Sequence, residues 1–224
     1  TRLRRDWSSD VCSSDLLLLH FLSSKRLYTM KKIILATSNL GKVRELNSML
    51  KGHYNVVSQI DMKVEEVAET GASFIENALI KARNASAQSQ LPALADDSGL
   101  VVDALNGKPG IYSARYAGEN ATDKDNIVKL LSRMGDQDDR RASFWCAMVF
   151  VRYANDPEPI IVEKSWEGQI LRELKGKNGF GYDPIFYLPE LNCTSAQLSA
   201  KEKNRRSHRG QALQEILKHL LSFE

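Results

Sequence analysis

The sequence predicts an α/β fold, with a long central mixed sheet flanked by helices and arranged as two lobes. Two observations indicate it. Short apolar runs of strand length alternate with amphipathic helical stretches in the first part of the chain, and two long segments rich in aromatic and β-branched residues follow in the second part. With 224 residues, no internal repeat and no long linker, the chain suits a single domain.

The folded part is expected to begin with a strand, a helix and a second strand. Ile33–Ala36 is a continuous apolar run, which is typical of a strand buried on both faces. The polar segment Thr37–Lys42 follows, and apolar residues then recur at helical spacing from Val43 to Leu50. Tyr54–Ser58 has the composition of the second strand.

A second helix and a third strand come next. Ser73 and Glu76 have the spacing of a capping box, so we expect a helix that opens there and runs to about Ala87. Leu91–Ala95 is a short apolar strand, which we expect to end at the turn Asp96–Gly99.

The second half of the sequence predicts a helix, then a β-hairpin, and then a closing helix. After the Gly- and Pro-containing loop Gly107–Gly110, Thr122–Asp125 has cap spacing for a helix. Ala142–Arg152 and Ile160–Ile170 are long strands that we expect to pair antiparallel. The remaining elements are a glycine-rich loop, a short strand and a closing amphipathic helix, over Lys175–Gly181, Ile185–Tyr187 and Ser207–Leu221.

The first 29 residues do not share this pattern. Thr1–Ser14 repeats a Ser-Ser-Asp element without periodicity, and the apolar run Leu16–Leu22 is too short to span a bilayer. Acidic residues lie between the N-terminal arginines and this run, and no small-residue cleavage site follows it, which argues against a secretory signal. We expect residues 1–29 to be a non-native or disordered extension and residues 30–224 to form the domain. A native disordered extension is the alternative.

Charge and cysteine content limit the kinds of partner and the cellular compartment that the sequence predicts. The net charge of +3 is too small to indicate nucleic-acid binding by itself, and the basic residues are spread along the chain apart from Lys201–Arg209. Cys12, Cys146 and Cys193 are odd in number and form no CxxC pair. This favours a reducing compartment and predicts a cytoplasmic protein with no membrane partner.

Thr37–Lys42 is a candidate phosphate site because it joins a buried strand to a helix. The N-terminus of a helix presents free N–H groups to an anion, Gly41 allows close backbone approach, and Lys42 adds a positive charge. The spacing is not that of a Walker loop. An ordinary capped turn between strand and helix is the alternative.

Asp96 and Asp97 form a candidate metal site. Adjacent carboxylates repel each other, and a bound cation would offset the repulsion; Mg²⁺ is held by one or two carboxylates, waters and substrate phosphates. Neighbours in an extended chain point to opposite faces, so one aspartate can face the site while the other anchors the turn. The alternative is an acidic surface turn in which Gly99 has a positive φ.

Other charged residues supply further candidates. Glu69, before Thr70 and Gly71, is the best second metal ligand in its acidic cluster, and Lys81 could reach phosphate from its helix, although a solvated lysine is equally expected. The string Phe180–Asp183 offers an aromatic ring for a base to stack on and a carboxylate acceptor, or else a tight turn into a strand.

The last candidates are cationic or potentially cationic groups. Lys203, His208 and Arg209 lie at the entry of the closing helix, where positive charge opposes the helix dipole, so a bound anion or polar ligand would compensate. The alternative for His208 is a structural histidine.

Five strings, in this order, resemble one family, the non-canonical purine NTP pyrophosphatases of the inosine/xanthosine triphosphate pyrophosphatase type. The resemblance is nearest to the bacterial members and runs from Met30 to Leu221. The strings are ATSNLGKVREL, ETGASFIENALIKA, LADDSGLVVDALNGKPGIYSARYAG, GFGYDPIF and SHRGQAL.

The resemblance implies a homodimer whose active-site cleft lies between two lobes, and it implies residue roles. Asp97 would be the general base and, with Glu69, a Mg²⁺ ligand, while Ser98 would contact substrate. The triphosphate would be held by Thr37, Ser38, Asn39, Leu40, Gly41 and Lys42, and the nucleotide and its base by Phe180, Gly181, Tyr182, Asp183, Lys203, His208 and Arg209. Two positions depart from the family: Ser38, where glycine is usual, and Ala68, where an acidic residue is common, which weakens the assignment of Glu69.

The implied activity is hydrolysis of ITP, dITP or XTP to the monophosphate and pyrophosphate. Donors in the base pocket suit the O6 acceptor of hypoxanthine or xanthine, whereas the 6-amino group of adenine would leave them unpaired. Three alternatives remain. They are a pyrophosphatase for other modified nucleotides, a non-catalytic nucleotide sensor, and a nucleic-acid-binding protein. The carboxylate pair argues against the last, because it would repel a phosphate backbone.

We expect removal of residues 1–29 to leave the melting temperature and turnover of the protein unchanged, because that segment carries no pattern matched elsewhere in the chain. Thermal unfolding of the full chain and of a chain starting at Met30 measures this. A large loss of stability or turnover in the shorter chain would show that the segment belongs to the folded protein.

Overall fold

The computed structural model describes residues 31–222, with side chains described as far as residue 220. The expected extension over residues 1–29 lies outside the described residues. Within them the chain forms a seven-stranded sheet in the order β2-β1-β3-β4-β5-β6-β7. None of the helices described there is long and apolar enough to cross a bilayer.

The sheet is mixed, as predicted. β1 (Lys32–Leu35) runs parallel to both of its neighbours, β2 (Asn55–Ser58) and β3 (Ala93–Val102). All later pairings are antiparallel. β4 (Arg141–Val151) and β5 (Ile160–Ile170) form the predicted hairpin.

Two short strands complete the sheet. β6 (Phe186–Leu188) starts one residue later than predicted, because Asp183–Ile185 form a 3₁₀ turn with Pro184 in its first positions. β7 (Cys193–Thr194) pairs with β6.

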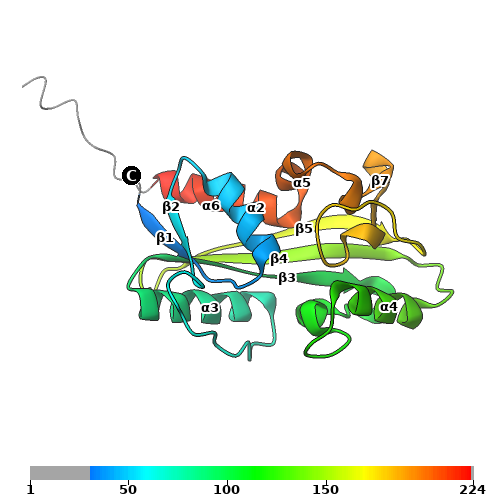
Figure 1. Cartoon of the computed structure of the whole chain (residues 1–224), viewed down its shortest axis with the longest axis horizontal. Helices are drawn as coiled ribbons and strands as arrows, with labels where there is room; N and C mark the ends of the chain where they lie inside the picture. The colour runs from blue at the N-terminus through cyan, green and yellow to red at the C-terminus, as the bar shows by residue number, and fades with distance from the viewer. Residues whose placement is uncertain (1–30, 223–224) are drawn as a thin grey trace, which may run out of the picture. The chain divides into compact units, whose positions relative to one another are not determined.

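Helices cover both faces of the sheet (Figure 1). On one face lie α3 (Phe74–Ser89) and α4 (Asp123–Met134), which open with the capping boxes expected at Ser73 and Thr122. On the other face lie α2 (Leu40–Leu50), α5 (Ala200–Arg206) and α6 (His208–Ser222). The sequence did not predict α5, because its residues AKEKNRR carry no apolar periodicity.

Alternation along the strands divides the core between these two helix layers. Leu94 of β3 packs in a cluster with Leu213 and Ile216 of α6. Ala95, the next residue, belongs to a separate cluster with the small side chains that α3 turns toward the sheet, which are Ala78, Ala82 and Ala85. Because these residues are alanines, the axis of α3 can lie close to the sheet.

The predicted end of the third strand is wrong. β3 does not turn at Asp96–Gly99 but continues to Val102, because β4 pairs with it along its whole length, including Asp97 with Ala147. Gly99 is also not a positive-φ residue. Its role is close approach, since a Cβ there would lie 2.2 Å from the carbonyl oxygen of Gly110 and 2.6 Å from Ser113 Oγ.

One edge of β3 is left open by the neighbouring strand. The pairing of β1 with β3 ends at Leu35 with Leu94, whereas β3 continues for eight more residues, Ala95–Val102. Beyond that point the chain leaves β1 and enters α2. Side chains from both faces of β3 can therefore meet around this edge.

We expect Gly99→Ala to lower the free energy of unfolding by about 1–3 kcal/mol, because the added methyl group meets backbone rather than a movable side chain. Denaturant unfolding with an unchanged m-value would measure it. Unaltered stability would contradict the close approach described here.

Candidate active site

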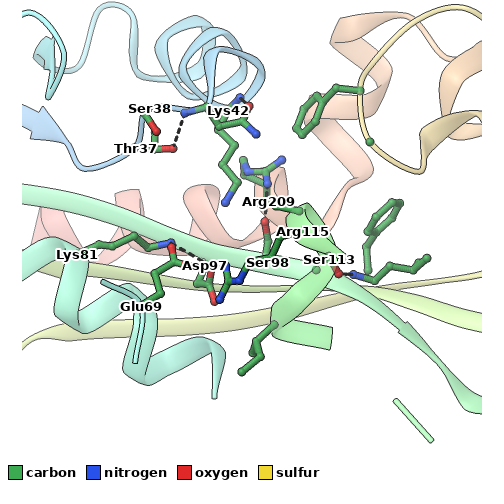
Figure 2. Close-up of a pocket in the computed structure, with 18 of the residues that line it drawn as sticks. Thr37, Ser38, Lys42, Glu69, Lys81, Asp97, Ser98, Ser113, Arg115 and Arg209 are labelled. Carbon is green, nitrogen blue, oxygen red and sulfur yellow. Dashed lines mark hydrogen bonds and ion pairs between the residues drawn. The ribbon is translucent and has the colours of Figure 1, made fainter. Parts of the chain in front are cut away.

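A cavity of about 850 Å³ lies at this open edge of β3. Figure 2 shows side chains from the start of α2, from α3, from β3 and from α6 converging on it. The cavity is lined by most of the predicted site residues, namely Thr37, Ser38, Asn39, Lys42, Glu69, Lys81, Asp97, Ser98, Phe180, Gly181, Tyr182, Asp183, Lys203, His208 and Arg209.

Leu40 and Gly41 do not line the cavity. The side chain of Leu40 is 61% exposed. Gly41 is buried beneath Phe180, and a Cβ at this position would lie 2.7 Å from the ring. The sequence motif therefore contains one residue that allows the Phe180 ring to approach α2 and one that points away from the site.

The junction of β1 and α2 is a capped turn, which was the alternative interpretation of this segment. Asn39 Oδ1 accepts hydrogen bonds from the N–H groups of Gly41 (2.9 Å) and Lys42 (3.2 Å), and Thr37 Oγ1 accepts one from Asn39 N. The cap does not exclude an anion site, because Ser38 and the Lys42 ammonium also face the cavity.

Asp96 is fully buried on the α2 and α6 face of the sheet and does not line the cavity. Its Oδ2 lies 3.0 Å from Lys42 Nζ and 3.1 Å from Arg209 Nε. Burial alone would raise the pKa of Asp96, but Lys42 and Arg209 outweigh it and hold this pKa far below its usual range. Asp96 is therefore an ionised anchor for two cations.

Asp97 lies on the opposite face, as strand alternation predicted. Lys81 Nζ is 3.0 Å from Asp97 Oδ1 and 2.7 Å from Glu69 Oε1, so one ammonium joins both carboxylates (Figure 2). Burial disfavours the charged lysine, but Asp97, Asp96 and Glu69 outweigh it and raise the pKa of Lys81. Lys81, for which a solvated helix lysine was the alternative, instead pairs with both carboxylates of the site.

Residues of the Phe180–Asp183 loop are held in place mainly by hydrogen bonds to other parts of the chain. Asp183 is 2% exposed and accepts from Lys203 Nζ (2.5 Å), Ser195 Oγ (2.8 Å) and Phe180 N (2.9 Å). The carboxylate expected to be an acceptor near the base is thus already engaged. Tyr182 donates its hydroxyl to the Ser113 carbonyl.

The Phe180 ring has two cations close by. Lys203 Nζ lies 4.7 Å and the Arg209 guanidinium 5.6 Å from its centroid. Cation–π contacts therefore hold the ring in place.

The sequence suggested a potentially cationic group at His208, but its surroundings disfavour the charged form. Burial, followed by the nearby charges of Arg209 and Lys203, lowers the pKa of His208 well below its ordinary value. The ring stacks on Phe144 at 5.0 Å. Its Nδ1 is buried and has no hydrogen-bond partner among the described residues.

Two charged residues of the site were missed by the sequence analysis. Glu45 accepts from Arg209 Nη1 (2.6 Å) and lies 2.9 Å from Lys203 Nζ. Arg115 lines the cavity and lies 3.5 Å from Glu69 Oε2. Glu45 is one turn from Lys42 on α2, and this shared helix face was the only signal available.

The two carboxylates near Lys81, those of Asp97 and Glu69, are the candidate metal ligands of the site. Among residues 31–222, no group of three or more His, Cys, Asp or Glu side chains is placed to hold a metal ion. Asp97 and Glu69 nevertheless converge on the same ammonium. Two carboxylates fit a Mg²⁺ ion that takes its other ligands from waters and substrate phosphates, which is its usual mode of binding.

Known proteins share both the sequence and the fold. The model of the Ham1 family matches residues 33–219. A dITP/XTP pyrophosphatase from Vibrio cholerae is 57% identical over 192 residues, which cover 84% of this chain and 96% of the relative. One from Photobacterium profundum is 54% identical, covering 84% and 96%.

Solved structures agree. A HAM1 protein from Coxiella burnetii has a TM-score of 0.80 and 48% identity, covering 86% of this chain and 100% of that one. A nucleoside-triphosphatase / dITP/XTP pyrophosphatase from Mycobacterium abscessus has a TM-score of 0.67 and 44% identity, covering 83% and 98%. The sequence strings, the mixed sheet and the charged cavity at the edge of β3 thus have one common explanation: the chain belongs to the Ham1 family.

Proposed function

We propose that this protein hydrolyses non-canonical purine nucleoside triphosphates (ITP, dITP and XTP) to the monophosphate and pyrophosphate, with Mg²⁺, and so removes them from the nucleotide pool. The observation that carries the proposal is the pairing of the Asp97 and Glu69 carboxylates with Lys81 at one end of the cavity and an aromatic ring with two cations at the other. Curated relatives that cover nearly the whole domain are named dITP/XTP pyrophosphatases.

The triphosphate binds at the β1–α2 junction. Thr37, Ser38 and Lys42 contact its oxygens, and Lys42 and Lys81 reduce its negative charge. Asp97 and Glu69 hold Mg²⁺, which when bound supplies further charge neutralisation at the phosphates. These residues mainly position the substrate and stabilise charge, which are the principal contributions in phosphoryl transfer.

Asp97 acts as the general base. Its carboxylate orients a water and accepts a proton from it as the water oxygen bonds to the α-phosphorus. The bond from the α-phosphorus to the bridging oxygen breaks, and pyrophosphate leaves with the electron pair. Asp97 suits this role because it lines the cavity, whereas Asp96 is enclosed by cations.

The purine is recognised at the other end. Its ring stacks on Phe180, and its O6 accepts a hydrogen bond from the ring of His208, which lines the cavity. Arg209 is fixed by Asp96, Glu45 and Ser98, so its guanidinium presents a positive edge without reorganisation. An adenine amino group would leave the hydrogen-bond donors of the base pocket unpaired. Such a mismatch can favour 6-oxopurines over adenine by about 10⁴-fold.

The protein acts in the cytoplasm as a homodimer in this proposal, and neither nucleic acid nor membrane is a partner. The carboxylates that line the cavity, among them Asp97 and Glu69, oppose a polyanion, which argues against nucleic acid. A sensor without turnover, or a pyrophosphatase for other modified nucleotides, is separated from the proposal by a panel of triphosphates.

With Mg²⁺ and ITP or XTP, we expect equimolar pyrophosphate and monophosphate, because the water attacks the α-phosphorus. Chromatography of the nucleotide product and a pyrophosphate assay measure this. EDTA should abolish turnover, and added Mg²⁺ should restore it. Orthophosphate with a nucleoside diphosphate would contradict the reaction, and full activity in EDTA would contradict the metal.

Asp97→Asn should lower kcat by ~10²–10⁴-fold, because it removes the proton acceptor with almost no change of shape. The matched control is Asp96→Asn. Asp96 lies outside the cavity but holds Lys42 and Arg209, which line it, so this change should mainly raise KM or lower stability. A normal kcat for Asp97→Asn, together with an inactive Asp96→Asn, would show that the neighbour is the catalytic carboxylate.

A further inference from the structure

Asn77 is a fully buried amide on the side of α3 that faces β3, and it does not line the cavity. Its Nδ2 donates a hydrogen bond to Asp97 Oδ2 at 3.3 Å. Its Oδ1 accepts one from the backbone N–H of Gly71 at 2.8 Å. Both ends of the amide are therefore used, and one of them reaches the carboxylate that acts as general base in the proposed reaction.

Asp97 is bound on both oxygens from one helix. Lys81 Nζ lies 3.0 Å from Oδ1, and Asn77 Nδ2 binds Oδ2. Asn77 and Lys81 are four residues apart, so their side chains lie one above the other on the same face of α3. With one donor on each oxygen, rotation of the carboxylate about its Cβ–Cγ bond would break two contacts.

The same amide also fixes the segment that carries Glu69. Gly71 approaches α3 so closely that a Cβ there would lie 2.7 Å from Asn77 Oδ1 and 2.6 Å from Glu76 Cβ. Gly71 is two residues from Glu69, which shares Lys81 with Asp97. Asn77 thus connects the positions of both carboxylates on the proposed metal side of the cavity.

We propose that Asn77 is a positioning residue that sets the orientation of the Asp97 carboxylate and its placement relative to Glu69; this rests on the function proposed above. A neutral amide is well suited to this task. It donates to Asp97 without adding a second positive charge, which would weaken Asp97 as a proton acceptor. Outer partners of this kind contribute to activity although they do not contact substrate.

The contact can be tested without substrate or metal. In Asn77→Asp the carboxylate still accepts from Gly71 N, but it meets Asp97 Oδ2 with an oxygen instead of a donor. We expect a lower Tm in EDTA. Adding Asp97→Asn to this variant exchanges the two groups and restores a donor–acceptor pair, so the double variant should recover most of the lost Tm. A double variant no more stable than Asn77→Asp would overturn the contact.

The catalytic consequence is measured at saturating Mg²⁺ with ITP. Asn77→Asp should lower kcat by about 10- to 100-fold. KM should change by less than about threefold, because Asn77 does not line the cavity. Asn77→Ser adds no buried charge and gives the same comparison if Asn77→Asp does not fold. An unchanged kcat in the folded variant, or a rise in KM alone, would overturn the proposal.

Ser86→Ala is the matched control. Ser86 is also buried on α3, but its hydroxyl donates a hydrogen bond to the Leu91 carbonyl and not to Asp97. Ser86→Ala should lower Tm and leave kcat unchanged. If Ser86→Ala lowered kcat as much as the Asn77 variants do, the loss of kcat in those variants would be a consequence of lower stability and not of a lost contact with Asp97. If the wild-type protein cleaves none of the triphosphates, the proposed function fails, whereas the recovery of Tm in the double variant still decides the contact between positions 77 and 97.

Discussion

The site depends on two adjacent aspartates, Asp96 and Asp97, that are both buried in the middle of a strand. An uncompensated buried carboxylate is costly, and two neighbours on one face would also repel each other. Strand alternation resolves this by directing Asp96 and Asp97 to opposite faces of β3, where each meets its own cations. Both helix layers are consequently tied to the same short stretch of strand.

On the Asp96 face the charges form a continuous network. Asp96 and Glu45 hold Arg209, Glu45 also contacts Lys203, and Lys203 is bound to Asp183. These residues come from β3, α2, α6, α5 and the loop before β6. The network therefore links the end of the cavity proposed for phosphate to the end proposed for the base, and it fixes cations before substrate arrives.

Local sequence signals predicted most of the fold and the membership of the site. Both capping boxes and the β4–β5 hairpin follow from short-range spacing, and they are present as expected. The predicted strand end at Asp96 was wrong because continued pairing with β4, a tertiary contact, overrides the polar composition of Asp96–Gly99.

The remaining differences also arise from contacts between distant segments. The neutral state of His208 depends on burial against Phe144, and the engagement of Asp183 depends on Lys203 and Ser195. Glu45 and Asn77 look like ordinary helix residues in the sequence, since their partners lie 164 and 20 positions away. No periodicity can show such partners.

The alanines between α3 and the sheet have a consequence for how this protein can change. Ala78, Ala82 and Ala85 set the height of α3 above β3, and the two residues of α3 that bind Asp97 move with that helix. A larger apolar residue at these positions would lift the helix and displace both donors together. In most parts of a hydrophobic core, a larger apolar residue changes only the packing. At these positions it would also move the donors to Asp97, so the same alanines determine both core packing and activity.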